Sequence, residues 1–197
     1  MVTEENRIRY QRNLLIPGFG EDGQERLAAA RVGIIGAGGL GSPAAYYLAA
    51  AGVGTLGIVD FDSVELSNLQ RQVLHGTNDL GRRKVDSAAD AIAALNPAVT
   101  VQTVAERLTG DNAHGILAAY DVVVEACDNF AAKYLINDTC LLLRKPFATA
   151  GILSMSGQTM FVVPGQTACL RCVVAEPPRN VPTTAERGVL GAVPGIL

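Results

Sequence analysis

The sequence predicts an α/β protein with a mainly parallel sheet and helices on both of its faces. Short apolar runs alternate with helical patterns over most of the chain, which is the order of elements that produces a parallel sheet. The 21 glycines and the many alanines suit close packing of helices against such a sheet. The length of 197 residues is enough for one domain with a sizeable core.

The first part of the chain combines a helical arm with the first alternating elements. Residues 5–30 contain helical segments around a Pro- and Gly-rich turn. Residues 42–51 predict a helix, because Pro43 lies in the first turn and Gly52 follows the last one. Apolar runs that end in glycine or aspartate predict buried strands over residues 31–35 and 55–59.

The alternation continues to about residue 165. Further helices are predicted over residues 84–95, 111–119 and 130–143, and further strands over residues 99–104, 121–126, 146–150 and 158–163. A loop is predicted over residues 175–188 and the opening of a helix over residues 188–197. We therefore divide the chain into an N-terminal helical arm (1–30), a sheet domain (31–165) and a terminal region (166–197).

Composition excludes several classes of protein. The net charge of −3 gives no bulk attraction to nucleic acid. The charged N-terminus has no apolar segment of a secretory signal, and no apolar run reaches the roughly 18 residues that a membrane-spanning helix requires. Four cysteines in such a chain argue against a disulfide framework. We expect a cytoplasmic protein with no membrane and no nucleic-acid partner.

A glycine-rich turn between the first strand and the next helix is typical of nucleotide sites. Gly36, Gly38 and Gly41 follow the G-x-G-x-x-G spacing, which allows a tight turn and presents free N–H groups of a helix to a phosphate. Asp60 ends the next strand, 19 residues after Gly41, where a carboxylate can bind ribose hydroxyls. The alternative for the glycines is that they serve only tight packing, and the alternative for Asp60 is that it caps a loop. This Rossmann-like pattern serves NAD and ATP equally.

Charged side chains farther along favour a triphosphate. Arg71 and Lys84 place two cations near one phosphate site, which suits the charge that develops when phosphorus is displaced. Asp128 ends a third strand, where it could ligate a Mg²⁺ ion that phosphates also hold. The alternative for the two cations is that they are solvated surface charges. The alternative for Asp128-Asn129 is that it caps the N-terminus of the next helix.

Gly36, Asp60 and Asp128 all follow the carboxyl ends of predicted strands. Ligands of open α/β sheets bind beyond those ends, so we expect the three residues to line one crevice. The sequence therefore predicts a Mg-ATP site at this edge of the sheet.

At these residues the chain resembles the ThiF/MoeB/HesA family, the bacterial relatives of ubiquitin-activating E1 enzymes. The resemblance covers about residue 5 to the end and is nearest to the MoeB-type members, the molybdopterin-synthase adenylyltransferases. The segments that match are Arg9–Arg12, Gly36–Gly41, Asp60–Gln72, Lys84, Asp128-Asn129 and Cys169–Cys172.

The resemblance implies an E1-like adenylyltransferase. Such an enzyme uses ATP and Mg²⁺ to adenylate the C-terminal glycine of a ubiquitin-like sulfur carrier that ends in Gly-Gly, and it releases pyrophosphate. Molybdenum cofactor synthesis is the pathway that the nearest members imply, and thiamine or cysteine sulfur transfer stays open. The carboxylate of the carrier attacks the α-phosphorus, so the enzyme supplies positioning and charge rather than a nucleophile.

The resemblance also implies roles for individual residues. Gly39 would contact the nucleotide through its backbone, Asp60 would bind ribose, and Asp128 would bind Mg²⁺. Phosphates would be held by Asn68, Arg71 and Lys84. The whole nucleotide-binding set would be Gly36, Gly38, Gly39, Gly41, Asp60, Ser67, Asn68, Leu69, Gln70, Arg71, Lys84, Asp128 and Asn129. Arg12 would act in the active site of the other subunit of a homodimer, although the sequence alone favours a surface arginine.

The cysteines and histidines form no second active centre. Cys169 and Cys172 supply half of a tetrahedral zinc site, and the second pair that the family carries is absent from this chain. Either the chain is truncated or it has no full Cys₄ site. We expect truncation, because residues 188–197 have the pattern of the opening of a helix that is cut short, and we expect zinc to be absent or weakly held. The crossover loop lacks the cysteine that many relatives carry, which argues against a thioester or persulfide step here. The remaining two cysteines are expected in the core, and both histidines are expected to be non-catalytic: Cys127, Cys140, His75 and His114.

Two other functions remain open at this point. An NAD-dependent oxidoreductase would use the same strand–turn–helix elements, but the chain lacks a recognisable catalytic His, Tyr or Lys set and a substrate domain. A non-catalytic binding subunit would lack the phosphate-binding residues, whereas Arg71, Lys84 and Asp128 are present.

Overall fold

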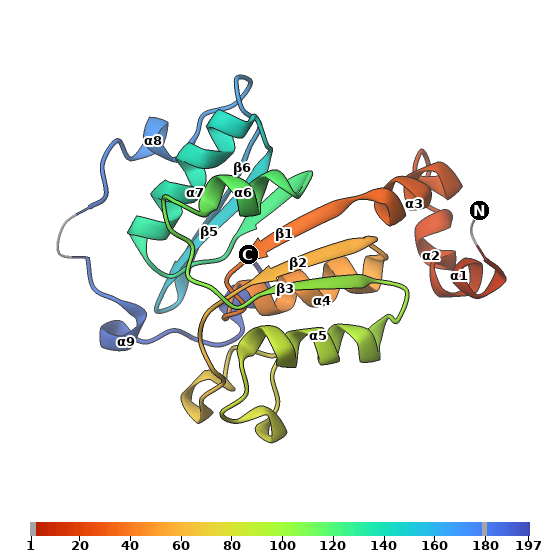
Figure 1. Cartoon of the computed structure of the whole chain (residues 1–197), viewed down its shortest axis with the longest axis horizontal. Helices are drawn as coiled ribbons and strands as arrows, with labels where there is room; N and C mark the ends of the chain where they lie inside the picture. The colour runs from red at the N-terminus through yellow and green to blue at the C-terminus, as the bar shows by residue number, and fades with distance from the viewer. Residues whose placement is uncertain (1–2, 179–180) are drawn as a thin grey trace.

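A computed structural model describes residues 3–178 and 181–197 of the chain (Figure 1). Residues 1–2 of the predicted arm and residues 179–180 of the predicted loop lie outside the described residues.

Six strands of the described chain form one sheet in the order β3-β2-β1-β4-β5-β6. Their bounds are β1 (Arg31–Ile35), β2 (Thr55–Val59), β3 (Thr100–Val104), β4 (Val122–Glu125), β5 (Phe147–Leu153) and β6 (Ser156–Val162). The first five strands are parallel, and β6 pairs antiparallel with β5. The predicted fold class is confirmed.

Helices precede, separate and follow these strands. Their bounds are α1 (Glu4–Arg9), α2 (Gln11–Leu14), α3 (Gly20–Ala29), α4 (Gly41–Ala51), α5 (Lys84–Leu95), α6 (Ala113–Ala118), α7 (Phe130–Leu143), α8 (Leu170–Val173) and α9 (Thr184–Arg187). Short 3₁₀ turns are η1 (Leu66–Asn68), η2 (Thr77–Asp79) and η3 (Val193–Gly195). Within the part of the chain that the structure describes, none of the helices has the length and apolar character to cross a bilayer.

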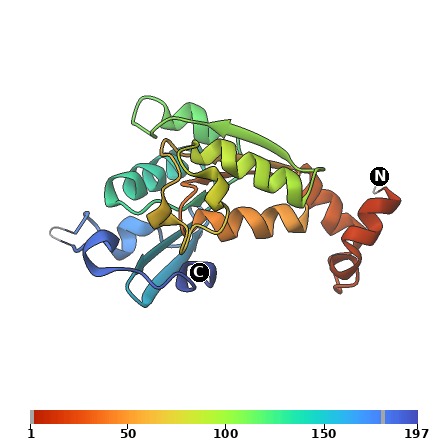
Figure 2. The ribbon, with the colours of Figure 1, turned by 90° about the horizontal axis from the view of Figure 1, so that it is seen from below.

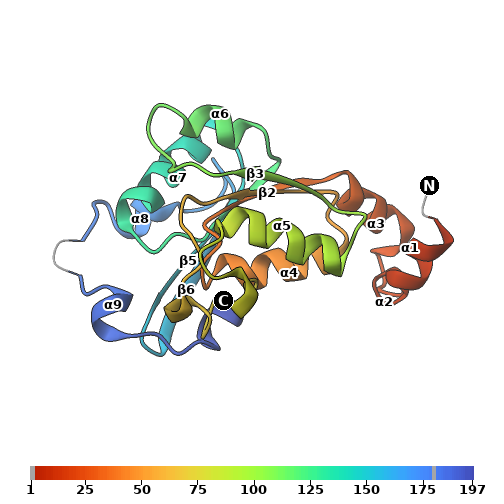
Figure 3. The ribbon, with the colours of Figure 1, turned by 60° about the horizontal axis from the view of Figure 1, so that its bottom comes forward.

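The helices cover both faces of the sheet. Ile34 and Ile58 pack on one face in a cluster with apolar residues of α4 and α5, which lie side by side (Figures 2 and 3). Ile35 and Val59, the next residue of each strand, pack on the other face with α6 and α7. The period of two along each strand thus divides its side chains between two cores.

The arm of α1, α2 and α3 lies beyond the amino ends of the strands (Figure 1). Asn96 Nδ2, just after the end of α5, donates a hydrogen bond of 2.8 Å to the Tyr10 hydroxyl. Gln24 Nε2 donates to the Ala51 carbonyl at the end of α4. The arm is therefore anchored to the end of the sheet domain opposite to the carboxyl ends of the strands.

The structure differs from the sequence prediction in the last third of the chain. Strands β5 and β6 join through a tight hairpin at Ser154-Met155, where Ser154 has a φ of 57°. The expected helix over residues 188–197 is wrong. Val189 instead pairs with Ser154 in a short parallel bridge, and η3 is the only helical turn described in that range. Extended pairing at Val189 leaves too few residues for an α-helix before Pro194.

Candidate functional site

A cavity of about 830 Å³ opens beyond the carboxyl ends of β1, β2 and β4. Gly36, Asp60 and Asp128 all line it, so the expected convergence of three strand ends is confirmed. Strands β1 and β4 are neighbours in the sheet. The chain continues from β1 to β2 and β3 on one side of this pair, and from β4 to β5 and β6 on the other. Open α/β sheets bind ligands at the point where the strand order reverses in this way.

The glycine-rich turn forms one wall of the cavity. Gly36 has a φ of 103°, a conformation that favours glycine, and a Cβ at Gly41 would lie 1.8 Å from the Gly36 carbonyl oxygen. The turn therefore closes tightly and starts α4 with its N-terminal N–H groups beside the cavity. At Gly39 an added Cβ would lie 3.3 Å from Arg71 Cγ, so the arginine stem lies against the turn.

Asp60 is fixed by backbone groups. Its Oδ2 accepts a hydrogen bond of 2.7 Å from the Ala37 N–H, and its Oδ1 accepts one of 2.8 Å from the Asp62 N–H. The residue is buried but still lines the cavity. Each carboxylate oxygen can accept a second hydrogen bond, so Asp60 retains the capacity to bind ribose hydroxyls.

Two cations lie at the same cavity. Lys84 begins α5, and its Nζ lies 3.2 Å from Asp62 Oδ2. Arg71 Nη1 donates to the Ser67 carbonyl at 3.1 Å, and Arg71 is half-buried. Both side chains line the cavity, so each can meet the negative charge of a bound polyphosphate.

Asp128 lies exposed at the rim of the cavity, and the next residue caps α7. Asn129 Oδ1 accepts a hydrogen bond from the Ala132 N–H at 2.9 Å, so the cap that the sequence offered as an alternative is present. The Asp128 carboxylate keeps its oxygens for other ligands. One carboxylate beside substrate phosphates is the usual protein contribution to a Mg²⁺ site, so the residues fit this ion.

A buried charge pair that the sequence analysis missed lies next to the cavity, and its lysine, Lys133, lines it. Lys133 Nζ, on α7, donates to Glu125 Oε2 at 2.7 Å and to the Ala150 carbonyl. Thr149 Oγ1 also donates to Glu125 Oε2, and the Cys127 N–H donates to Glu125 Oε1 at 2.7 Å. Glu125 thereby joins the ends of β4 and β5 to α7. The signal in the sequence was an acidic residue inside an apolar strand.

Cys140 is a core residue, as predicted, whereas Cys127 is half-buried, packs against the same apolar cluster and also lines the cavity. Burial, reinforced by the Glu125 carboxylate, raises the pKa of the Cys127 thiol well above its usual range. Burial likewise raises the pKa of Cys140 to about 12. Both thiols are therefore protonated at neutral pH and are poor nucleophiles.

Other predicted residues do not line the cavity, and their role in binding stays a prediction. Ser67, Asn68, Leu69 and Gln70 form η1 and the turn after it, next to Arg71. Asn68 is buried, and its Oδ1 accepts a hydrogen bond from the Glu65 N–H at 3.1 Å. In this structure Asn68 shapes the segment that presents Arg71.

Arg12 also does not line the cavity of its own chain. It is exposed on α2, two residues after Tyr10, which contacts Asn96 at the far end of α5 from Lys84. The 12 residues of α5 correspond to a length of about 18 Å. An arginine side chain cannot span that distance, so Arg12 does not reach the cavity of its own chain.

Cys169 and Cys172 lie with their Sγ atoms 3.7 Å apart. Two thiolates of a tetrahedral zinc site with Zn–S bonds of about 2.3 Å are about 3.8 Å apart, so the pair has the right geometry. Burial opposes ionisation of Cys169, but hydrogen bonds from the Cys172 backbone and thiol and from the Arg171 backbone outweigh it and lower the pKa. Among the described residues no group of three or more His, Cys, Asp or Glu side chains could hold a metal, so the pair remains half a site.

Two features show that the cavity fits a polar ligand. The glycines of the turn leave open space next to Arg71, and a Cβ at Gly39 would reduce that space. Gln72 lines the cavity, and its buried Oε1 has no hydrogen-bond partner among the described residues. Buried polar atoms are normally paired, so this carboxamide suits contact with a bound molecule.

Comparison with known proteins agrees with this geometry. The ThiF family model matches residues 10–197. The chain is 48% identical to the probable adenylyltransferase/sulfurtransferase MoeZ of Mycobacterium tuberculosis over 98% of its own length and 50% of that protein. It is 46% identical to the sulfur carrier protein adenylyltransferase of Thermus thermophilus, over 99% of its length and 74% of that protein. The chain thus spans about half the length of MoeZ.

A solved structure has the same fold. E. coli MccB, crystallised with AMPCPP and MccA, superposes with a TM-score of 0.80 at 26% identity, over 97% of this chain and 60% of that one. The match of the family model to nearly the whole chain, together with these identities, shows that the chain belongs to the ThiF family.

Proposed function

We propose that this chain is an adenylyltransferase domain that activates the C-terminal carboxylate of a ubiquitin-like sulfur carrier with Mg-ATP. The observation that carries the proposal is the meeting of the glycine-rich turn with the cations Arg71 and Lys84 and the carboxylates Asp60 and Asp128 in one cavity of about 830 Å³. Relatives named adenylyltransferases, one of them for a sulfur carrier protein, support it.

The proposed reaction is displacement at the α-phosphorus of ATP. The carrier carboxylate attacks this phosphorus, the bond to the bridging oxygen breaks, and pyrophosphate leaves. Asp60 orients the ribose, and the glycine-rich turn offers N–H groups to phosphate oxygens. Arg71 and Lys84 neutralise the charge that accumulates on pyrophosphate. Asp128 would hold Mg²⁺, which supplies further charge neutralisation when bound.

The rest of the cavity suits the tail of the carrier. Beyond Asp128 the lining becomes mostly apolar and comes from the terminal region, including Val174, Val181, Pro182 and Val189. A Gly-Gly tail has no side chains and can enter as extended backbone, so it could lie along this apolar part of the cavity.

We further propose a homodimer in which Arg12 of one subunit completes the site of the other. The exposure of Arg12, and its position at the far end of α5 from the cavity, support action between subunits. For the pathway we propose molybdenum cofactor synthesis, with thiamine and cysteine sulfur transfer as the alternatives that a panel of carriers separates.

Pyrophosphate exchange tests the proposal. Wild-type protein with ATP, Mg²⁺ and labelled pyrophosphate should form labelled ATP only with a cognate Gly-Gly carrier. Arg71→Ala and Asp128→Ala should each abolish exchange while the melting temperature stays close to that of wild type. Normal exchange in both variants would contradict the assignment, and tight binding of NADH in a fluorescence titration would favour an oxidoreductase instead.

A further inference from the structure

His75 is a buried titratable residue that the proposed reaction does not use. We infer that His75 is a positioning residue for nucleotide binding: it holds the Ala37 carbonyl so that the N–H of Gly38 faces the bound phosphate. The inference rests on the proposed function in that it requires a nucleotide at this turn.

The hydrogen bonds of His75 determine which nitrogen carries the proton. Its Nε2 lies 3.0 Å from the Ala37 carbonyl oxygen, and its Nδ1 lies 2.8 Å from Ser87 Oγ on α5. A carbonyl oxygen only accepts, so Nε2 must donate. In the neutral ring Nδ1 is then the acceptor, and the Ser87 hydroxyl donates to it. Both residues are buried, which suits a neutral ring.

The peptide bond between Ala37 and Gly38 transmits this contact to the cavity. The described chain has no cis peptide bonds, so the N–H of Gly38 points away from the Ala37 carbonyl and from His75. Gly38 lines the cavity. The Ala37 N–H is held separately by Asp60 Oδ2. Ala37 is therefore held at both its N–H and its carbonyl, within a turn whose glycines have no side chains to fix them.

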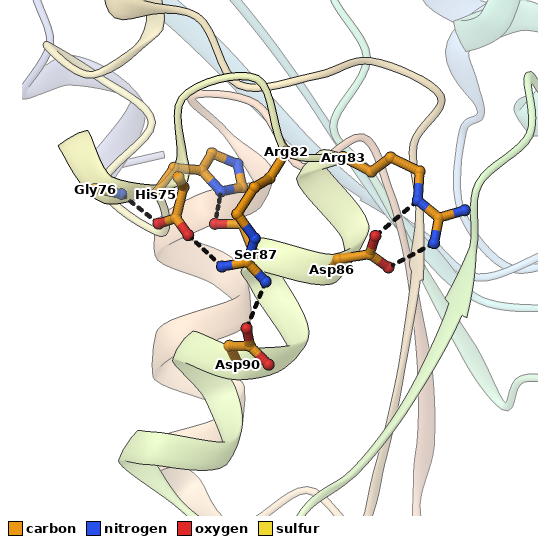
Figure 4. Close-up of polar contacts among 8 residues, drawn as sticks. His75, Gly76, Arg82, Arg83, Asp86, Ser87 and Asp90 are labelled. Atoms are coloured by element: carbon orange, nitrogen blue, oxygen red, sulfur yellow. Dashed lines mark hydrogen bonds and ion pairs between the residues drawn. The ribbon is translucent and has the colours of Figure 1, made fainter.

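The turn that presents His75 is itself tied to α5 (Figure 4). The Gly76 N–H donates to Asp79 Oδ2 at 2.9 Å, and Arg82 pairs with Asp79 and with Asp90 of α5. These contacts place His75 and Ser87 against each other without any contribution from the ligand. The support for the Ala37 carbonyl is therefore built into the fold before a nucleotide binds.

The test compares His75→Phe with His75→Gln. Phenylalanine keeps the ring but removes the donor, whereas glutamine places an Nε2 donor at the same number of bonds from Cβ. The matched control is Ile92→Val, a core change on the same helix as Ser87 that lowers stability and removes no hydrogen bond of the turn. Dissociation constants for Mg-ATP are measured by calorimetry without a carrier, and melting temperatures are measured in parallel.

We expect His75→Phe to raise the dissociation constant about tenfold, the equivalent of about 1.4 kcal/mol and of one buried hydrogen bond. His75→Gln should restore affinity to within about threefold of wild type, and Ile92→Val should leave it unchanged. If His75→Phe does not fold, Ser87→Ala replaces it, with an expected loss of about threefold because the ring loses the donor that orients it.

Three results would overturn the inference: wild-type affinity in His75→Phe (or in Ser87→Ala, where it replaces that variant), equal weakening in the Phe and Gln variants, or equal weakening in Ile92→Val. Failure of the proposed function gives a different pattern. Wild-type protein that binds ATP but exchanges pyrophosphate with no carrier contradicts the carrier activity and leaves the role of His75 intact. Wild-type protein that binds no ATP contradicts both.

Discussion

Lys84 Nζ lies 3.2 Å from Asp62 Oδ2, and both residues line the nucleotide cavity. The Lys84 side chain is only 7% exposed, whereas that of Asp62 is 50% exposed. The Asp62 carboxylate thus holds the Lys84 ammonium group at the cavity wall. If the two groups separate, water can solvate the exposed carboxylate. A polyphosphate that enters the cavity can therefore take over Lys84 without leaving a buried carboxylate unpaired.

Replacement of Lys84 by alanine should reduce carrier-dependent pyrophosphate exchange by roughly 10²–10³-fold, the usual loss when one group that stabilises transition-state charge is removed. The matched control is Arg83→Ala. Arg83 is the preceding basic residue, but it is exposed, pairs with Asp86 and does not line the cavity. Exchange rates at saturating ATP should be near wild type for Arg83→Ala. Equal losses in the two variants would mean that general surface charge, and not the Lys84 contact, matters.

Mixed subunits should restore activity if Arg12 acts on a second copy. Arg12→Ala has an intact cavity and a defective arm, and Asp128→Ala has the reverse. In a randomly mixed 1:1 sample half of the dimers pair the two variants, and each of these contains one complete site, so activity should reach about a quarter of wild type. The measurement is exchange activity after the two inactive variants are mixed and allowed to re-associate. No recovery, with heterodimers present by mass, would contradict the arrangement.

The stability of the protein should fall as the pH is lowered below about 6.5, partly because of His75. Burial lowers the pKa of His75; the Lys84 ammonium adds to this, and the Ala37 carbonyl, Asp60 and Asp79 oppose it. With the folded pKa below the unfolded one, the unfolded state binds more protons in that window, so stability is complete above the unfolded pKa and is lost as the pH falls. Urea unfolding between about pH 5 and 7 should show a smaller slope for His75→Gln. An identical slope would show that other groups cause the dependence.

Removal of Lys133 should destabilise the fold more than most single substitutions. The Glu125 side chain is fully buried and that of Lys133 is 10% exposed, so Lys133→Met leaves a carboxylate without its cation. We expect a loss of about 3–5 kcal/mol in the free energy of unfolding. The double variant Lys133→Met with Glu125→Leu should recover part of that loss, because the uncompensated charge is gone. A double variant less stable than Lys133→Met alone would contradict this, and would show that the hydrogen bonds of Glu125 to Cys127 and Thr149 outweigh the cost of its unpaired charge.

The sequence predicted the part of the site that follows from strand order. Gly36, Asp60 and Asp128 could be brought together from sequence because each follows a strand, and parallel strands present their carboxyl ends at one edge. Helix α5 was predicted with its bounds because its apolar face, Asn96-Pro97 and a polar start leave little choice.

Contacts between distant elements could not be predicted in this way. Glu125 and Lys133 are eight residues apart, but they meet only because α7 packs back across β4 and β5. The hairpin at Ser154-Met155 lacks the glycine or asparagine that signals such turns, so the extension of β5 beyond residue 150 could not be predicted. The pairing of Val189 with Ser154 depends on that hairpin.

Intact-mass analysis of the carrier shows directly whether this chain adenylates it. The chain is incubated with Mg-ATP and individual small proteins that end in Gly-Gly, and the mixture is quenched in acid and analysed at once. We expect a cognate carrier to gain the mass of one adenylate at its C-terminal glycine, and a carrier lacking this glycine to gain none. An unmodified carrier in every pairing, with the chain folded and ATP bound, would contradict the proposed adenylyltransferase activity.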